Sequence, residues 1–131
     1  MCCDTLEGRS VSLLGNQHAA VYCTPFHWIA VDPIKKKGDA HKTLDTLFRS
    51  VGVPRVLIIP DDAAELTQGE FKRKADRAQA LIHPTEAYTP NANIAEDRIR
   101  ELKRAHRRAM AATNTPACLW DLCLVHTALI R

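Results

Sequence analysis

The chain has 131 residues, of which 46% are hydrophobic and 25% charged, and its formal net charge is +3. This composition indicates one globular domain that buries a core without disulfides, and an aromatic content of 5% argues against a base-stacking platform. The five cysteines form no C-x-x-C pair, so we expect reduced thiols in an intracellular protein, nuclear or cytoplasmic. The sequence shows neither a signal peptide nor an apolar run of membrane-spanning length, so no membrane partner is expected.

The first 34 residues favour a small antiparallel meander of about three strands. The first candidate strand contains Asp4, and short apolar runs follow at 11–14, 19–23 and 26–31. The Asp-Pro pair at 32–33 is expected to end the last of these runs.

The middle of the chain alternates between helix and strand. Residues 40–51 are predicted to form an amphipathic helix, because Leu44, Leu47 and Val51 recur at helical spacing. The apolar run at 56–59 is typical of a buried parallel strand.

Further elements complete the predicted order: a helix at 68–79 opened by the capping box Thr67-x-x-Glu70, a short strand at 80–82, a loop at 83–93, a long helix at 94–113 and a last helix from Ala117. A meander followed by alternating helices and strands predicts an α/β fold, with a mixed sheet and helices on its faces. Such a fold is compatible with the ribonuclease H-like fold, and with others.

The sequence lacks the local motifs of several common enzyme classes. No G-x-S-x-G, Walker-A or G-x-G-x-x-G pattern occurs, and the six histidines show no metal-ligand spacing. Serine hydrolases, P-loop ATPases and dinucleotide-binding enzymes are therefore not expected.

Three acidic residues stand where such a fold would bring them together. Asp4 lies in the first candidate strand, Asp61 follows the buried strand, and Glu96 lies in the first turn of the long helix. Three convergent carboxylates suit two divalent ions about 4 Å apart, which clamp the attacking and leaving oxygens of a phosphoryl transfer. Each acid also has a plainer interpretation: Asp4 as a solvated residue, Asp61 as part of a turn, and Glu96 as the capping-box partner of Asn93.

The long helix carries six basic residues and one acid between positions 98 and 108. Arg100, Lys103 and Arg107 follow Glu96 at i+4, i+7 and i+11 and therefore share its helical face, and Arg104 is a fourth candidate. A row of bases beside a metal-binding carboxylate could bind the phosphates of a DNA backbone and position that backbone at the metal. The alternative is a solvated charged face, although one acid can pair with only one of the six bases.

Short stretches along nearly the whole chain occur in the order found in one known family. They are Asp4-Thr5, Leu13-Leu14-Gly15-Asn16, Gly52-Val53-Pro54-Arg55, Asp61 through Phe71, Tyr88-Thr89-Pro90, Ala95 through Arg108, and Pro116 with Leu119-Trp120. In this ordered set the sequence resembles the catalytic core of retroviral-type integrases, and most closely the integrase segment of Copia-type retrotransposon polyproteins.

The resemblance implies an α/β, ribonuclease H-like fold with a mixed five-stranded sheet and helices on both faces. It implies a DDE triad of Asp4, Asp61 and Glu96 that holds two magnesium or manganese ions and performs 3′-end processing and strand transfer of element DNA into target DNA. Arg100 and Lys103 match DNA-contacting positions of the family, and a homo-oligomer on DNA is implied. Residues 1–131 would form one integrase core, clipped in its first strand, without the zinc-binding and C-terminal domains.

The sequence also departs from the family pattern around the second aspartate. Asp62 follows Asp61 where Asn or Gly is usual, Pro60 precedes it, and Glu96 comes one residue earlier than is commonest. Two alternatives to an active polynucleotidyl transferase therefore stay open. One is a catalytically inactive remnant that binds DNA or dimerises, and the other is a ribonuclease H-like nuclease.

Overall fold

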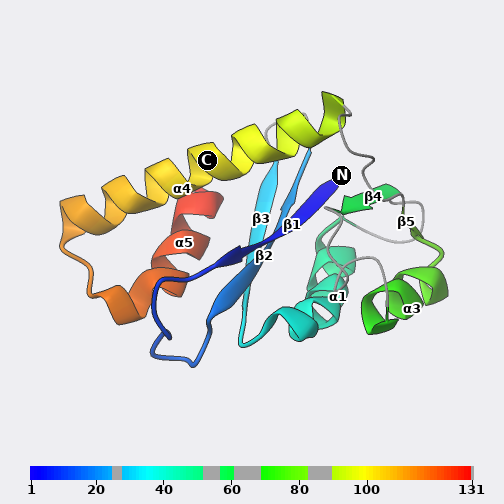
Figure 1. Cartoon of the computed structure of the whole chain (residues 1–131), viewed down its shortest axis with the longest axis horizontal. Helices are drawn as coiled ribbons and strands as arrows, with labels where there is room; N and C mark the ends of the chain where they lie inside the picture. Colours follow the sequence, from blue (N-terminus) through cyan, green and yellow to red (C-terminus); the bar gives the residue numbers. More distant parts are fainter. Residues whose placement is uncertain (25–27, 52–56, 61–68, 83–89, 131) are drawn as a thin grey trace.

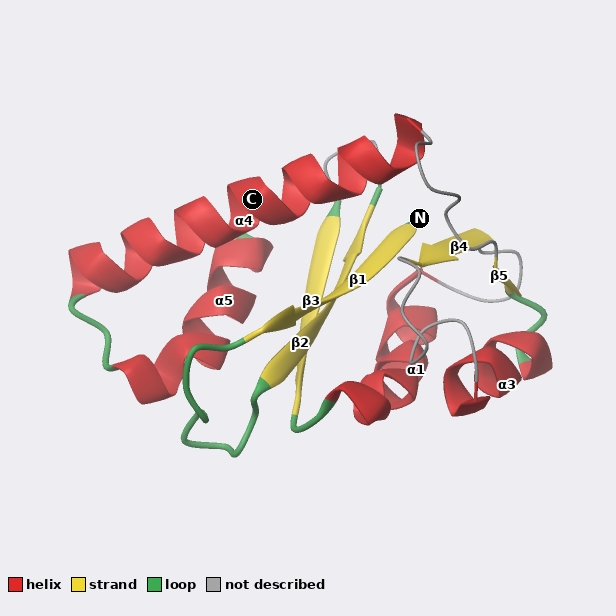
Figure 2. Cartoon of the chain, in the orientation of Figure 1, coloured by secondary structure: helices red, strands yellow, loops and turns green. Residues whose placement is uncertain are grey.

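The structure is a computed structural model that describes residues 1–24, 28–51, 57–60, 69–82 and 90–130. Its strands are hydrogen-bonded in the order β3-β2-β1-β4-β5. Figures 1 and 2 show the chain from one side, with these strands labelled. The first three strands form the predicted antiparallel meander, and β4 and β5 continue it in parallel to β1. The strand bounds are β1 (Cys2–Glu7), β2 (His18–Cys23), β3 (Ile29–Ile34), β4 (Leu57–Pro60) and β5 (Leu81–Ile82).

Helices cover both faces of this sheet, which confirms the predicted mixed α/β architecture. Two of them, α1 and α3, pack on one face, and α4 and α5 pack on the other (Figure 2). The described part of the chain contains no helix that is both long enough and apolar enough to cross a membrane. The helices are α1 (Ala40–Val51), α3 (Gly69–Arg77), α4 (Pro90–Thr113) and α5 (Trp120–Leu129), with 3-10 turns η1 (Lys37–Asp39) and η2 (Ala117–Leu119).

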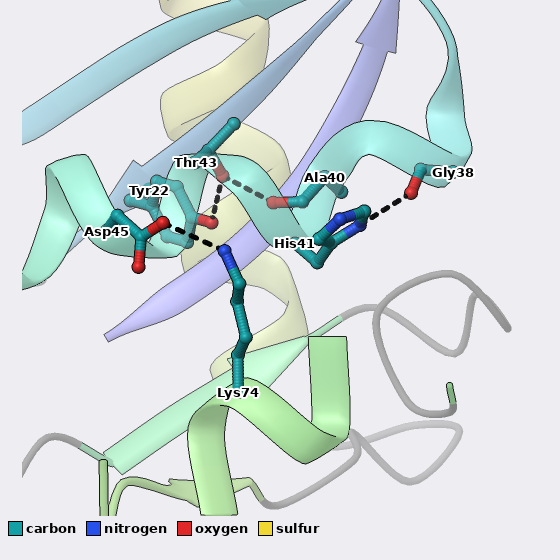
Figure 3. Close-up of polar contacts among 7 residues, drawn as sticks. All are labelled: Tyr22, Gly38, Ala40, His41, Thr43, Asp45 and Lys74. Atoms are coloured by element: carbon teal, nitrogen blue, oxygen red, sulfur yellow. Dashed lines mark hydrogen bonds and ion pairs between the residues drawn. The ribbon is translucent and has the colours of Figure 1, made fainter. Parts of the chain in front are cut away.

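One face of the sheet packs on α1 through apolar residues and a buried polar contact. Leu44 and Leu47 of α1 lie in one core cluster with Tyr22 of β2, as their helical spacing predicts. The Thr43 hydroxyl donates to the Ala40 carbonyl at 2.7 Å, so the Tyr22 hydroxyl, 2.6 Å away, donates to Thr43 (Figure 3). Burial of the Tyr22 phenol on this face raises its pKa well above the usual value.

The same face also holds α3, next to α1. An ion pair joins Lys74 of α3 to Asp45 of α1, with 2.8 Å between Nζ and Oδ2 (Figure 3). Phe71 and Ala75 of α3 are buried in the cluster that contains Leu44. This helix is therefore anchored by its apolar face, since an exposed ion pair contributes little by itself.

The opposite face of the sheet packs on α4 and α5. Val21 of β2 lies in one cluster with Ile99 and Leu102 of α4 and with Leu124 of α5. His106 of α4 also reaches α5, with its Nε2 3.0 Å from the Trp120 carbonyl oxygen. These contacts fix α4, which carries Glu96 and the basic row, against the strands.

The apolar run at 11–14 was expected to form a strand, and this expectation is wrong. The run lies in the loop between β1 and β2, and its three large apolar side chains are more than half exposed. Its backbone donors are used elsewhere: Ser12 N–H donates to the Asn16 carbonyl at 2.9 Å and Leu13 N–H to the Cys118 carbonyl at 2.7 Å. The amides of Ser12 and Leu13, bonded within the loop and to η2, are therefore not available to a strand ladder.

The third strand lies further along the chain than predicted. It was expected at 26–31, whereas β3 spans Ile29–Ile34 and contains Pro33; Phe26 and His27 lie outside the described residues. Because β3 is at the edge of the sheet, the missing amide of Pro33 costs no hydrogen bond to a further strand. The Asp-Pro pair is therefore part of the strand and does not end it.

The predicted elements between 40 and 82 agree with the structure to within two residues where it describes them. The predicted helix at 40–51 coincides with α1, and α3, β4 and β5 lie at the predicted places with small shifts at their ends. The capping residue Thr67 and the position Val56 lie outside the described residues. All five cysteines are free thiols.

The loop between β1 and β2 is tied to the start of α5 by the buried carboxylate of Asp121. Asn16 Nδ2 donates to Asp121 Oδ2 at 2.8 Å. Burial disfavours the charge of Asp121, but hydrogen bonds from Ser12 and Asn16 outweigh that effect and hold its pKa below the usual range. The charged carboxylate therefore links two segments that are about a hundred residues apart.

Gly8 allows the same loop to pass directly over the indole ring of Trp120. A Cβ at this position would meet ring carbon Cη2 at 3.0 Å and two further ring carbons at closer range. The ring cannot easily move, because it is buried and its Nε1 donates to the Ser10 carbonyl at 2.8 Å.

We expect Gly8→Ala to lower the free energy of unfolding by about 2 kcal/mol, measured by urea denaturation. Gly38→Ala is the control, because a Cβ there meets nothing within 4 Å, and equal losses in both variants would contradict this packing.

Candidate active site

Asp4 lies in the middle of β1, on the face of the sheet that α4 and α5 cover. Side chains alternate along a strand, so Asp4 shares a face with Leu6, which lies in one cluster with Ile99 of α4. Val21, the cross-strand partner of Asp4, belongs to the same cluster. Asp4 is half-buried, and its Oδ1 accepts the N–H of Thr5 at 2.7 Å. The prediction that Asp4 is a strand residue is confirmed.

The neighbouring strand β4 runs parallel to β1, and its register relates the two candidate aspartates. Cys2 is paired with Ile59 and Cys3 with Pro60. Pro60 directly precedes Asp61 in the sequence, as Cys3 directly precedes Asp4. Asp61 itself lies outside the described residues, so its predicted role stays a prediction.

Glu96 is an exposed residue in the second turn of α4, and not in the first turn as predicted. The helix begins at Pro90, four residues before the predicted start at Ile94. Proline is favoured in the first turn of a helix, where its missing N–H would have no intrahelical partner. Since Asn93 lies inside the helix, the alternative role of Glu96 as its capping-box partner is wrong.

The basic row follows Glu96 along one continuous helix, as predicted. Arg100, Lys103 and Arg107 are exposed, and so is Arg104 on the neighbouring face of α4. Arg100 forms an ion pair with Asp97, with 3.2 Å between Nη1 and Oδ1. Within the described part of the chain, no ion pair engages the other three bases. They are therefore available to an external anion.

Asp4 and Arg98, which lies near the beginning of α4, both influence the pKa of the Cys23 thiol. Burial raises the pKa of Cys23 to about 11, and the thiol of its strand partner Cys2 adds to this effect. Arg98 lowers the same pKa, while Asp4 raises it. Both charges therefore act on one buried thiol at the end of β2. Sequence reasoning missed this electrostatic effect, because it depends on how α4 crosses the strands.

Arg98 differs from the exposed bases of the row by its partial burial. Its side chain is 25% exposed, against 59% for Arg100. It forms an ion pair with Glu101 at 3.3 Å. Two of the bases in α4 are therefore matched by acids within one turn, which leaves the positive charge concentrated further along the helix.

The donor set fits a hard divalent cation better than a soft one. Carboxylate oxygens, as Asp4 and Glu96 offer them, are the donors that magnesium and manganese take. Burial raises the pKa of the Cys23 thiol, which disfavours the thiolate that a soft metal would need. In the part of the chain that the structure describes, no three His, Cys, Asp or Glu residues form a metal-holding group, and Asp61 is not in that part.

Comparison with solved structures defines the class of fold. The catalytic core domain of BIV integrase superposes with a TM-score of 0.74 at 11% sequence identity, over 98% of this chain and 80% of that one. A chain of the simian T-cell lymphotropic virus intasome, solved in complex with PP2A regulatory subunit B56 gamma, superposes with a TM-score of 0.73 at 14% identity. That match covers 97% of this chain and 46% of the intasome chain, so this chain spans less than half of it.

The chain therefore has the fold of a retroviral integrase catalytic core, as in BIV integrase. No protein-family model matches the sequence, and no curated protein is similar to it. At such low identities the likeness establishes the fold, while the chemistry has to come from the residues described above.

Proposed function

We propose that this chain is the catalytic core of a retrotransposon integrase, of the Copia type, that joins element DNA to target DNA. The observation that carries the proposal is the placement of Asp4 on the strand face covered by α4, the helix that bears Glu96. The pairing of Pro60 with Cys3 supports Asp61 as the second carboxylate. The integrase-core fold supports DNA as the substrate class.

In the proposed reaction, a 3′-hydroxyl oxygen attacks the phosphorus of a phosphodiester. One P–O bond forms and one breaks, the attacking hydroxyl loses its proton, and the leaving oxygen gains one. Asp4, Asp61 and Glu96 would hold two magnesium or manganese ions, which stabilise the charge on both oxygens when bound. The exposed bases Lys103 and Arg107 would hold the backbone that is delivered to the carboxylates.

The experiment is a disintegration assay on branched DNA with a labelled 3′-hydroxyl strand. We expect strand joining in the presence of Mg²⁺ or Mn²⁺, and a complete loss when EDTA removes the metal. Equal background with and without metal would overturn the enzymatic proposal and leave an inactive, DNA-binding remnant. Metal-dependent cleavage of an RNA–DNA hybrid, without joining of the branched substrate, would instead indicate a ribonuclease H-like nuclease.

Self-association on DNA is part of the same proposal. Most soluble oligomers are symmetric assemblies of identical chains, and we expect this core to act as a dimer or larger oligomer. Sedimentation of the chain with and without a duplex tests this point, and a monomer under both conditions would contradict it.

A further inference from the structure

A second group of bases gathers at one end of the sheet, away from the row on α4. Gly8 N–H donates to the Gln17 carbonyl at 2.7 Å, and Gln17 N–H donates to the Ile34 carbonyl at 3.1 Å. These bonds align the ends of three neighbouring strands, and the residues that follow Gly8 and Ile34 are basic. We name this group the basic end; its members are Arg9, Lys35, Lys36 and Lys37, and all four are exposed.

The acids near the basic end do not neutralise it. Asp39, two residues beyond the lysines, is engaged by Lys42 at 3.3 Å. Glu7 is exposed at the last position of β1, but among the described residues it forms no ion pair with the basic end. Four bases therefore face solvent against one unengaged acid, a surface that attracts a polyanion.

The basic end lies at the far end of the sheet from the candidate active site. Lys35 directly follows Ile34, which pairs with His18 at the start of β2. Cys23, the thiol on which Asp4 and Arg98 act, is at the other end of the same strand. Figure 1 shows the turn from β3 into α1 below the strands and the beginning of α4 above them.

We propose that the basic end is a second binding surface for the phosphate backbone of DNA, distinct from the row on α4. Phosphodiester charges repeat at short intervals, so a run of flexible lysines can contact several of them and release their counterions. The inference rests on the proposed function, in that DNA is the partner. It adds that a DNA segment contacts the domain away from the carboxylates.

The test measures the affinity for a fluorescently labelled 20-base-pair duplex between 50 and 200 mM NaCl. In the variant Lys35→Gln/Lys36→Gln/Lys37→Gln, we expect the slope of log affinity against log salt to become shallower by about 2 to 3, since each lost contact contributes about 0.9. The matched control is Arg49→Gln/Lys72→Gln/Arg77→Gln, which removes three exposed bases from α1 and α3. We expect its slope to change by less than about 1.

A third variant separates this inference from the proposed function. Arg100→Gln/Lys103→Gln/Arg107→Gln removes the row on α4, and its effect on the slope should add to that of the lysine variant. A lysine variant with the slope of the control, beside an α4 variant that loses binding, would overturn the second surface and leave the proposed function intact. An α4 variant that binds like the wild type, beside a weakened lysine variant, would support the second surface and contradict delivery of DNA along α4.

Discussion

Replacing Asp4 by Asn or Glu96 by Gln should each reduce strand joining on the order of a thousandfold. Each change removes one negative charge with little change of shape, and the Asp4→Asn side chain retains an oxygen that can accept the Thr5 N–H. Loss of a carboxylate that holds a catalytic cation costs several kcal/mol of transition-state stabilisation. At about 1.4 kcal/mol per factor of ten, this corresponds to roughly a thousandfold loss of rate.

The disintegration assay under single-turnover conditions measures this loss, and Glu101→Gln is the matched control. Glu101 is exposed on the same helix as Glu96, and its ion pair with Arg98 is of the kind that contributes little to stability. We expect the rate of the Glu101→Gln variant to stay within about threefold of the wild-type rate. A threefold change in rate corresponds to about 0.7 kcal/mol in activation free energy. Equal rates for Glu96→Gln and Glu101→Gln would remove Glu96 from the catalytic group.

Replacing Leu102 by Ala should lower the free energy of unfolding by about 3 kcal/mol. Leu102 is 1% exposed and lies in the cluster that joins α4 to β2 and α5. A truncated leucine in such a position loses both the transfer free energy of its removed atoms and the contacts around the new cavity. Because Leu102 helps to hold α4 on the strands, we also expect a lower rate of strand joining.

Urea denaturation at pH 7 measures the stability effect, and Leu122→Ala provides the comparison. Leu122 lies in α5 with 51% of its surface exposed, so its truncation should cost less than about 0.5 kcal/mol. If the two leucine variants lost the same stability, the packing of α4 described here would be wrong.

Hydrophobic periodicity predicted some elements well, because in them the apolar spacing in the sequence matches the pattern of burial in the fold. α1 coincides with its predicted range, since Leu44 and Leu47 recur at helical spacing and are both buried in the structure. The meander was predicted from short apolar runs, and two of its three strands overlap those runs. In these segments, the apolar residues whose spacing predicts the helix or strand are also the residues that pack in the core.

Proline misled the prediction in two places, for reasons that depend on the position of the residue in the fold. Pro33 lies in a strand because that strand is at the edge of the sheet, where one side of the backbone needs no partner. Pro90 begins α4, although a loop was predicted there, because the first turn of a helix does not use its amides. The sequence alone does not distinguish an edge strand from a central one, nor a proline that opens a helix from one that precedes it.

The candidate site was partly predictable. The helical spacing of Glu96, Arg100 and Lys103 is a local property, and α4 preserves it as one continuous helix. The combined effect of Arg98 and Asp4 on the pKa of Cys23 depends on the path of α4 across the sheet, which no local pattern encodes. The pairing of Arg100 with Asp97 was missed because the charge count began one residue after that acid.

The anchoring of the loop between β1 and β2 on α5 has a consequence for how the chain is made. Ser10, Leu13 and Asn16 form hydrogen bonds with Ala117, Trp120, Cys118 and Asp121, so these contacts join segments that are synthesised far apart in time. While the ribosome is still translating α4, the loop lacks its hydrogen-bond partners in η2 and α5. Closure of so long a segment is slow compared with a local hairpin. The meander therefore acquires its final form only when α5 has emerged, and a nascent chain stalled before Ala117 should be open to proteases in this loop.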